Sequence, residues 1–194
     1  MTSLNIFTKC PYTGNPKSRL RNFLTAKERV FITKYMILNI LKEVTEIKGI
    51  HINLWVYPNY KHKFFKNISS RYDINLLKQT GNSLFERMQN CIISESKSYK
   101  KIILIGSDIP SITNECIEEA IACLDKKNYV VGPSKDGGFY LLGIKNFNHN
   151  RINLLEHKNG NCLSITKFLD EKIISYNVLM KLKDIDTKAD LLSF

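Results

Sequence analysis

Aspartates and small residues follow two short apolar runs in the second half of the chain. Residues 102–105 are four consecutive aliphatics that end at Gly106, Ser107 and Asp108, and residues 129–133 lead to Asp136-Gly137-Gly138. In open α/β sheets, ligands bind at the carboxyl ends of the strands. A carboxylate there can hold a divalent metal, and the metal can hold phosphates. We therefore expect Asp108 to bind Mg²⁺ or Mn²⁺.

Two cations follow the first apolar run of the chain. Residues 9–20 contain two prolines, a glycine and an asparagine, which favour a turn, and then Lys17 and Arg19. Arginine can bind phosphate oxygens through two hydrogen bonds and lysine supplies a point charge, so both are predicted to bind phosphate. The loop matches neither GxxxxGK[ST] nor GxGxxG, so it is not a Walker A loop and a Rossmann site is unsupported. A solvated basic turn is the alternative.

Asp108 and the Asp136-Gly137-Gly138 motif have structural as well as functional explanations. Asp108 before Ile-Pro could simply form a turn, and Asp-Gly-Gly is a standard hairpin signal. In the functional interpretation, Gly137 and Gly138 let a substrate approach the backbone, and Asp136 accepts hydrogen bonds from substrate hydroxyls, meets the metal, or acts as general base.

The motif Asp184-Ile185-Asp186-Thr187 is a candidate second source of carboxylates. Thr187 and Asp190 fit a helix cap, which leaves Asp184 and Asp186 unexplained, and we expect Asp186 to be a second metal ligand. Farther upstream, Gln79 and Gly81 follow an expected strand and could contact a nucleoside, although a polar turn explains them as well.

Strand and helix signals alternate along the chain. Apolar alternation and capping boxes predict strands at 4–9, 50–57, 72–78, 100–105, 129–131, 139–144 and 173–182, and helices at 25–44, 83–92, 113–124 and 163–169 and from 187. Residues 145–162 are expected to form a loop. This alternation predicts one α/β domain over residues 1–194, with a mostly parallel, mixed sheet in a three-layer α/β/α sandwich.

Composition excludes several classes of protein. No apolar run reaches the roughly 18 residues that cross a membrane, and the first residues do not resemble a signal peptide. The 5 cysteines are odd in number, widely spaced and form no C-x-x-C pair, which argues against a disulfide framework, so a reducing cytoplasm is the expected compartment. The 4 histidines show no metal-binding spacing. The net charge of +11 comes almost entirely from residues 1–71, which carry 13 Lys/Arg against 3 Asp/Glu. In the absence of a nucleic-acid-binding motif, nucleic acid is not an expected partner.

Five ordered segments resemble the DUF2064 family of small glycosyltransferase-like proteins, in the nucleotide-diphospho-sugar transferase superfamily. They are Lys9-Cys10-Pro11 through Gly14 to Lys17-Ser18-Arg19-Leu20; Gln79 and Gly81 with 84–88; Gly106 to Pro110; Pro133 to Gly143; and Asp184 to Leu191. The chain departs from the family pattern at Ser18, Phe85 and Phe139. It also lacks the Trp-[Ser/Gly]-Thr element, having His157-Lys-Asn-Gly-Asn-Cys162 in that region.

The resemblance implies a GT-A-like fold and a metal-dependent transferase. The main expectation is glycosyl transfer from a nucleotide sugar to an unknown small-molecule acceptor, on Asp108 and Asp136 as catalytic residues, with Asp108 and Asp186 on the metal. Lys17, Arg19, Gln79, Gly81 and Ser107 would hold the nucleotide. The alternatives are nucleotidyl transfer from a nucleoside triphosphate, as in the similar 2-phospholactate guanylyltransferases, and non-catalytic nucleotide binding. The acceptor and the oligomeric state are left open.

Overall fold

A computed structural model describes residues 1–148 and 161–193. Its strands are β1 (Thr2–Lys9), β2 (Ile50–Tyr57), β3 (Asn75–Lys78), β4 (Lys101–Gly106), β5 (Tyr129–Pro133), β6 (Phe139–Lys145) and β7 (Tyr176–Val178). Its helices are α1 (Ala26–Val44), α2 (Lys63–Tyr72), α3 (Leu84–Glu95), α4 (Asn114–Lys126), α5 (Cys162–Glu171) and α6 (Lys188–Leu192), with a 3₁₀ turn at Ser18–Leu20.

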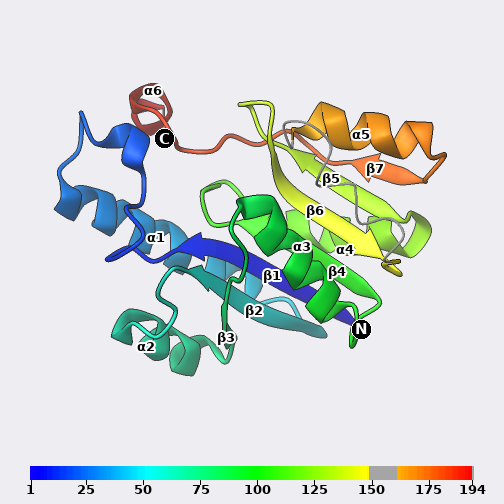
Figure 1. Ribbon diagram of the computed structural model, residues 1–194, viewed down its shortest axis with the longest axis horizontal. Coiled ribbons are helices and arrows are strands. Elements are labelled where there is room, and N and C mark those ends of the chain that lie inside the picture. Colours follow the sequence, from blue (N-terminus) through cyan, green and yellow to red (C-terminus); the bar gives the residue numbers. More distant parts are fainter. Residues whose placement is uncertain (149–160, 194) are drawn as a thin grey trace.

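The strands form a 7-stranded sheet in the order β3-β2-β1-β4-β6-β5-β7 (Figure 1). β1 pairs in parallel with β2 and β4, whereas β6 is antiparallel to both β4 and β5. The hairpin that joins β5 to β6 therefore reverses one strand in an otherwise parallel sheet. The expected mixed, mostly parallel sheet is confirmed.

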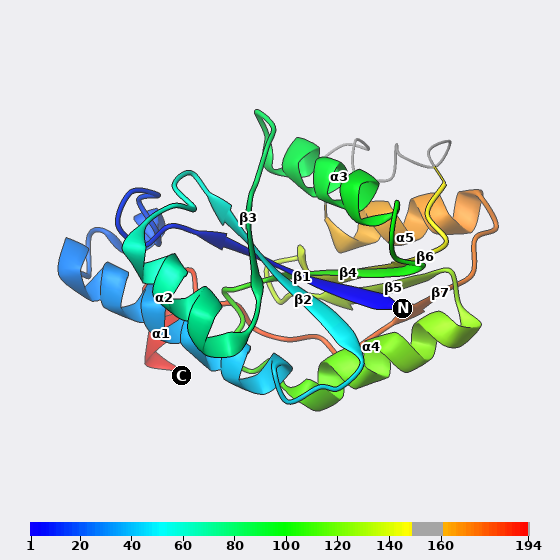
Figure 2. The same ribbon diagram turned by 90° about the horizontal axis from the view of Figure 1, so that it is seen from below.

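Helices cover both faces of this sheet, as Figure 2 shows with α3 and α5 on one side and α1, α2 and α4 on the other. Two apolar clusters fill the space between the layers. One joins Ile37 and Leu41 of α1 to Leu4 and Ile103 of the sheet, and the other contains Ile92 of α3. The three-layer sandwich is confirmed. None of the helices described combines the length and the apolar character that crossing a membrane requires.

Local signals explain where the helices begin. The Thr25 side chain accepts a hydrogen bond from the backbone N–H of Glu28, and the Glu28 carboxylate accepts one from the backbone N–H of Thr25, so the predicted capping box forms. At α3 the Ser83 side chain accepts from the N–H of Glu86. These caps fix the starts of α1 and α3, which follow β1 and β3 in the chain.

Two expected strands differ from the structure. The strand expected at 72–78 is shorter, because Tyr72 ends α2, a helix that the sequence did not predict, and Asp73 turns the chain in the left-handed region at φ 50°. The strand expected at 173–182 is reduced to β7, and Ile173 also has a positive φ, of 53°. Most of the loop expected at 145–162 falls at 149–160, outside the described residues.

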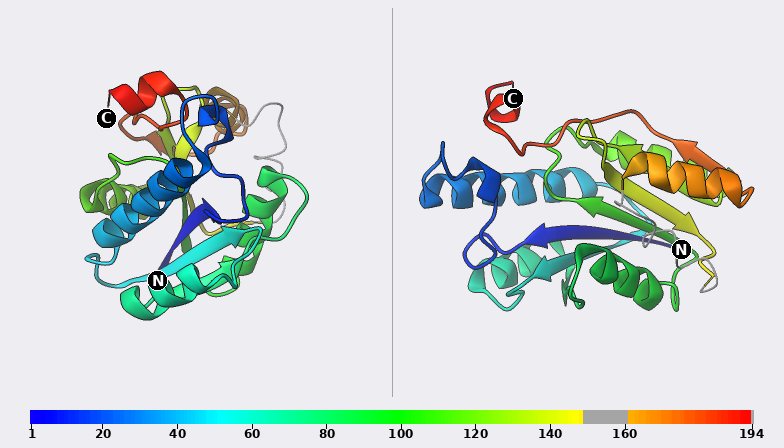
Figure 3. Two further views of the ribbon diagram at one scale, coloured as in Figure 1. Left: turned by 90° about the vertical axis from the view of Figure 1, so that its left-hand side faces the viewer. Right: turned by 45° about the horizontal axis from the view of Figure 1, so that its top comes forward.

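The topology brings the ends of four parallel strands to one edge. The carboxyl ends of β3, β2, β1 and β4 are neighbours there, and the turn after β1 and the C-terminal α6 come together beyond them (Figure 3). Residues separated by more than 160 positions therefore meet at this edge.

Candidate functional site

The turn after β1 has a conformation that tight packing enforces. A Cβ on Gly14 would lie 2.7 Å from the carbonyl oxygen of Cys10, so the close approach requires glycine. Arg29 of α1 donates from Nη1 to Asn15 Oδ1 at 3.0 Å. Lys17 then adopts a left-handed conformation with φ 51°. The turn thereby directs the Lys17 side chain inward, toward the end of β4.

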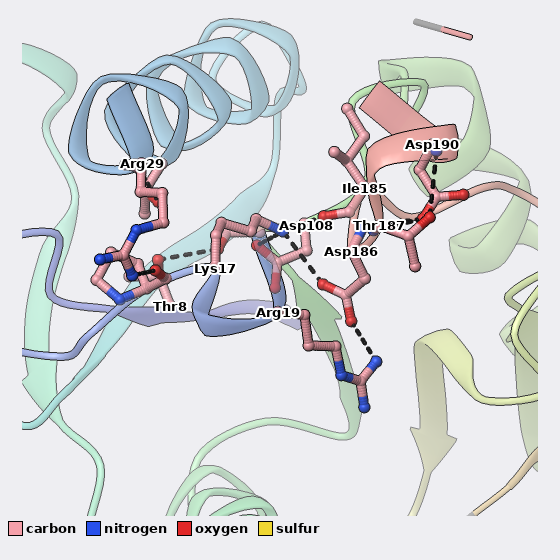
Figure 4. Close-up of polar contacts among 12 residues, drawn as sticks. Thr8, Lys17, Arg19, Arg29, Asp108, Ile185, Asp186, Thr187 and Asp190 are labelled. Atoms are coloured by element: carbon pink, nitrogen blue, oxygen red, sulfur yellow. Dashed lines mark hydrogen bonds and ion pairs between the residues drawn. The ribbon is translucent and has the colours of Figure 1, made fainter. Parts of the chain in front are cut away.

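Three oxygen atoms surround the ammonium of Lys17 (Figure 4). Its Nζ lies 2.8 Å from Asp108 Oδ1 and 3.5 Å from Asp186 Oδ1. The same Nζ donates to the carbonyl oxygen of Ile185 at 2.6 Å. The Lys17 side chain is only 3% exposed, so this cation is held inside the protein by its partners. Asp108 and Asp186 thus converge on one positive charge, which is the ammonium of Lys17.

Backbone contacts bring the Asp186 carboxylate to the Lys17 ammonium. The N–H of Ile185 donates to the carbonyl oxygen of Asp108 at 3.2 Å. One turn later, Thr187 and Asp190 form the predicted capping box, and the Asp190 carboxylate also accepts from the N–H of Asp186. The hydroxyl of Thr187 is the main cause of the lowered pKa of Asp190. Asp190 therefore has a structural role that holds Asp186 in place.

Arg19 forms the outer side of the cluster. Its Nη1 lies 2.8 Å from Asp186 Oδ2, and its side chain is 71% exposed. Since guanidinium carries five N–H donors, most of them stay free for another anion. Of the two predicted phosphate-binding cations, Arg19 is thus accessible, whereas Lys17 already binds two carboxylates.

A cavity of about 590 Å³ lies beside this cluster. Among the predicted site residues, its lining includes Lys17, Arg19, Gln79, Ser107, Asp108, Gly138 and Asp186. Gly81, Asp136 and Gly137 are not among the residues that line it. Most of the predicted site thus comes together in one cavity at the carboxyl edge of the sheet.

Asp136 serves the hairpin between β5 and β6. Its Oδ1 accepts hydrogen bonds from the Ser134 hydroxyl and from the N–H of Gly138. The Ser134 hydroxyl is the main cause of the lowered pKa of Asp136. A carboxylate with a lowered pKa is a weak proton acceptor near neutral pH. The geometry therefore supports the turn-forming interpretation of Asp136 and does not favour the general base.

Two other predicted residues have their donors engaged. Gln79 donates from Nε2 to the carbonyl oxygens of Thr8 at 3.1 Å and Trp55 at 2.8 Å, so only its Oε1 could contact a base. The Ser107 hydroxyl donates to Thr8 Oγ1 at 2.9 Å. Both side chains are buried, and both tie neighbouring strand ends together. Gly81 has φ 133° and packs against the first turn of α3, where it shapes the loop instead of facing the cavity.

A stacked pair that the sequence did not predict also lines the cavity. The guanidinium of Arg87 lies 4.1 Å from the ring centroid of Tyr57, and both residues line the cavity. Nε of Arg87 is buried and has no hydrogen-bond partner among the residues that the structure describes. Tyr57 stands at the carboxyl end of β2, so the strand-end rule that singled out Asp108 could also have found it.

The carboxylates of Asp108 and Asp186 are the type of oxygen ligand that a divalent metal such as Mg²⁺ prefers. Within residues 1–148 and 161–193, no group of three or more His, Cys, Asp or Glu side chains is placed to hold a metal. Mg²⁺ bound with a nucleotide, however, is often held by only one or two carboxylates plus substrate phosphates and water. Asp108 and Asp186 meet that requirement. Asp184 is separate: burial, followed by the charge of Asp136, raises its pKa.

The sequence of this chain is similar to those of a known family and of several known enzymes. The model of a family described as "Uncharacterized protein conserved in bacteria (DUF2064)" matches residues 40–157. A 2-phospho-L-lactate guanylyltransferase from Methanocaldococcus vulcanius is 27% identical over 179 residues, covering 90% of this chain and 76% of the relative. The enzyme of the same name from Methanococcoides burtonii is 23% identical over 185 residues, covering 93% and 79%.

Solved structures share the architecture. A protein from Desulfovibrio desulfuricans G20, provisionally assigned as a nucleotide-diphospho-sugar transferase, superimposes with a TM-score of 0.86 at 20% identity, covering 98% of this chain and 84% of that one. A 4-diphosphocytidyl-2C-methyl-D-erythritol synthase from Anaerococcus prevotii gives a TM-score of 0.68 at 12% identity, with coverage of 100% and 93%. These likenesses confirm the expected fold.

Proposed function

Because this chain belongs to the DUF2064 family, and because its cavity gathers the carboxylates of Asp108 and Asp186 with the cations of Lys17 and Arg19, we propose that it is a metal-dependent nucleotidyltransferase. It would transfer a nucleotidyl group from a nucleoside triphosphate to a phosphorylated small molecule. The prediction of a transferase is confirmed by the relatives. Their guanylyltransferase activity favours nucleotidyl transfer, which the sequence analysis held as an alternative, over glycosyl transfer.

The convergence of Asp108 and Asp186 on one cation is the observation that carries this proposal. In the proposed complex, the two carboxylates hold Mg²⁺ or Mn²⁺ at the edge of the cavity. The bound metal would neutralise charge on the triphosphate and on the leaving pyrophosphate. Arg19, whose free donors face outward from Asp186, binds the phosphates that become the leaving group.

The reaction needs little acid–base chemistry from the chain. An oxygen of the acceptor phosphate attacks the α-phosphorus, a new P–O bond forms, and the bond to the pyrophosphate breaks. A phosphate monoester has a second pKa near 6 and is largely dianionic at neutral pH, so no side chain has to remove a proton. Transfer of a sugar to a hydroxyl acceptor would ordinarily require a general base. Among the described residues that line the cavity, the carboxylates are Asp108 and Asp186, and both are paired with Lys17.

The Tyr57–Arg87 pair supports the placement of the nucleoside. A flat ring with a guanidinium stacked on it offers the kind of surface on which nucleobases stack. The pair lines the same cavity as the phosphate-binding cations. We place the base there, with Gln79 Oε1 as a hydrogen-bond acceptor at its edge.

Pyrophosphate release is the direct test. The protein is incubated with GTP, ATP, CTP or UTP, Mg²⁺ or Mn²⁺, and a panel of small phosphorylated acids that includes 2-phospholactate. We expect pyrophosphate only when triphosphate, acceptor and metal are all present. Turnover of a nucleotide sugar without pyrophosphate release would instead support glycosyl transfer. Metal-dependent nucleotide binding without any turnover would support a binding protein.

A further inference from the structure

The position of the Lys17 ammonium conflicts with a metal on the same carboxylates. Three oxygens face Nζ: Asp108 Oδ1 at 2.8 Å, Asp186 Oδ1 at 3.5 Å and the carbonyl of Ile185 at 2.6 Å. Carboxylate and carbonyl oxygens are the ligands that Mg²⁺ prefers, at distances near 2.1 Å. A metal shared by the two aspartates would therefore have to take the place of the ammonium.

The two cations cannot occupy this position together. Each would lie within a few ångströms of the other in a partly buried site, where like charges repel strongly. Lys17 is also an unusual residue to find buried, because lysine is almost never buried unless it is paired. Here its ammonium is paired with both carboxylates and occupies the position between them.

We propose that Lys17 is a built-in competitor for the metal, and that a divalent ion binds Asp108 and Asp186 only when the Lys17 side chain swings away. This inference rests on the part of the proposed function that places the metal on these two carboxylates. The inference goes beyond the proposed function because it makes Lys17 the residue that sets the metal affinity. Lys17 lines the cavity, so the released ammonium remains beside the phosphates of a bound nucleotide.

The structure confines the movement to the side chain. Gly14 packs against the backbone of Cys10, Arg29 binds Asn15, and the N–H of Leu20 donates to the carbonyl oxygen of Lys17 at 2.9 Å. The backbone of the turn is therefore fixed from both sides. Rotation about the bonds of the long Lys17 side chain is the movement that remains.

Mn²⁺ binding without nucleotide tests the competition. Free Mn²⁺ is measured by electron paramagnetic resonance during titration of the wild type, Lys17→Met and Arg19→Met. Removing the ammonium from between the carboxylates should tighten Mn²⁺ binding by about tenfold or more. Arg19→Met is the matched control, since it removes an equal charge that also pairs with Asp186 but is exposed, and its effect should be about threefold or less.

Equal Mn²⁺ affinity in the wild type and Lys17→Met would overturn the proposal, and so would equal effects of Lys17→Met and Arg19→Met. Absence of Mn²⁺ binding in all three proteins would overturn it as well. Pyrophosphate release is scored separately, so a failure of the competition and a failure of the proposed activity are distinguishable.

A second measurement uses the unaltered protein, in case Lys17→Met does not fold. The amines are acetylated briefly with and without Mg²⁺, and modification of each lysine is read by mass spectrometry. We expect Lys17 to react slowly without Mg²⁺ and faster when Mg²⁺ is saturating, whereas exposed Lys27 reacts equally in both. A Lys17 reactivity that saturating Mg²⁺ leaves unchanged would contradict the displacement.

Discussion

Replacement of Asp108 by asparagine should separate activity from stability. The Asp108 side chain is 54% exposed, and it lies 2.8 Å from Lys17 Nζ. An ion pair with one partner so exposed contributes about 1 kcal/mol or less. Asparagine has the same shape and keeps an oxygen that can accept from the ammonium. In a domain of this size, about 1 kcal/mol corresponds to a fall in Tm of about 2–4 °C, which is the largest change we expect.

The same substitution should strongly reduce turnover. It removes one of the two negative charges that would hold the cation beside the triphosphate, and losses of such electrostatic groups lower kcat by about 10²–10³. The assay is initial pyrophosphate release at saturating nucleotide and metal, with thermal unfolding measured on the same preparations.

Asp125→Asn is the matched control for Asp108→Asn. Asp125 is also an exposed carboxylate, 64% accessible, and it pairs with Lys101 at the opposite end of β4. We expect it to cause a similar small change in Tm with unchanged turnover. If Asp108→Asn keeps wild-type turnover, or loses turnover only in proportion to its unfolded fraction, the reasoning about Asp108 is wrong.

Three further predictions concern the cavity wall, acid stability and the sheet. Tyr57→Ala should raise the KM for nucleotide about tenfold, because stacking on an aromatic side chain contributes about 1–3 kcal/mol per base; an unchanged KM would remove Tyr57 from the nucleoside site. The pKa of Asp190 is lowered, chiefly by the hydroxyl of the threonine three residues earlier, so its contribution to stability is complete above the unfolded pKa of about 3.9 and is lost as pH falls below it. Urea unfolding between pH 5 and pH 2 should thus show a weaker acid dependence for Asp190→Asn, and an identical dependence would contradict this. Gly132→Ala would place a Cβ 2.5 Å from Tyr140 Cζ and should destabilise the protein by about 1–3 kcal/mol in urea unfolding, whereas Gly106→Ala meets nothing within 4 Å and should change stability far less.

Much of the architecture could be predicted because its signals are local. The caps at Thr25 and Ser83 and the aliphatic run of β4 determine structure within a few residues, and each is found where the sequence placed it. α2 was missed because its buried face consists chiefly of Phe65 and Ile68, which is too few positions to give a clear helical period.

The sequence indicated which residues gather at the site, but not that Lys17 forms ion pairs with Asp108 and Asp186. Strand-end position indicated Asp108, and the motif around Thr187 indicated Asp186. No sequence rule states that the ammonium of Lys17 lies between them, because that depends on a left-handed turn held by Arg29 from another element. Lys17 was therefore expected to face phosphates directly, whereas the structure pairs it with the carboxylates.

A buried network of polar side chains under α3 could also not be predicted from the sequence. Asn5 Oδ1 accepts from Asn53 Nδ2 at 3.0 Å and from Trp55 Nε1 at 2.9 Å, and Asn53 also donates to Glu95 Oε2 at 2.9 Å. Central parallel strands are usually apolar, so their side chains are ordinarily expected to pack without polar partners. The polar partners become visible only when β1, β2 and α3 are assembled.

The most direct measurement is a crystal structure with Mn²⁺ and a non-hydrolysable nucleoside triphosphate, with the ion located by its anomalous scattering. The account predicts one anomalous peak bonded to carboxylate oxygens of both Asp108 and Asp186, with the phosphates against Arg19 and the Lys17 ammonium displaced from its position between the two aspartates. A peak bonded to neither aspartate, or a triphosphate bound away from this cavity, would contradict it.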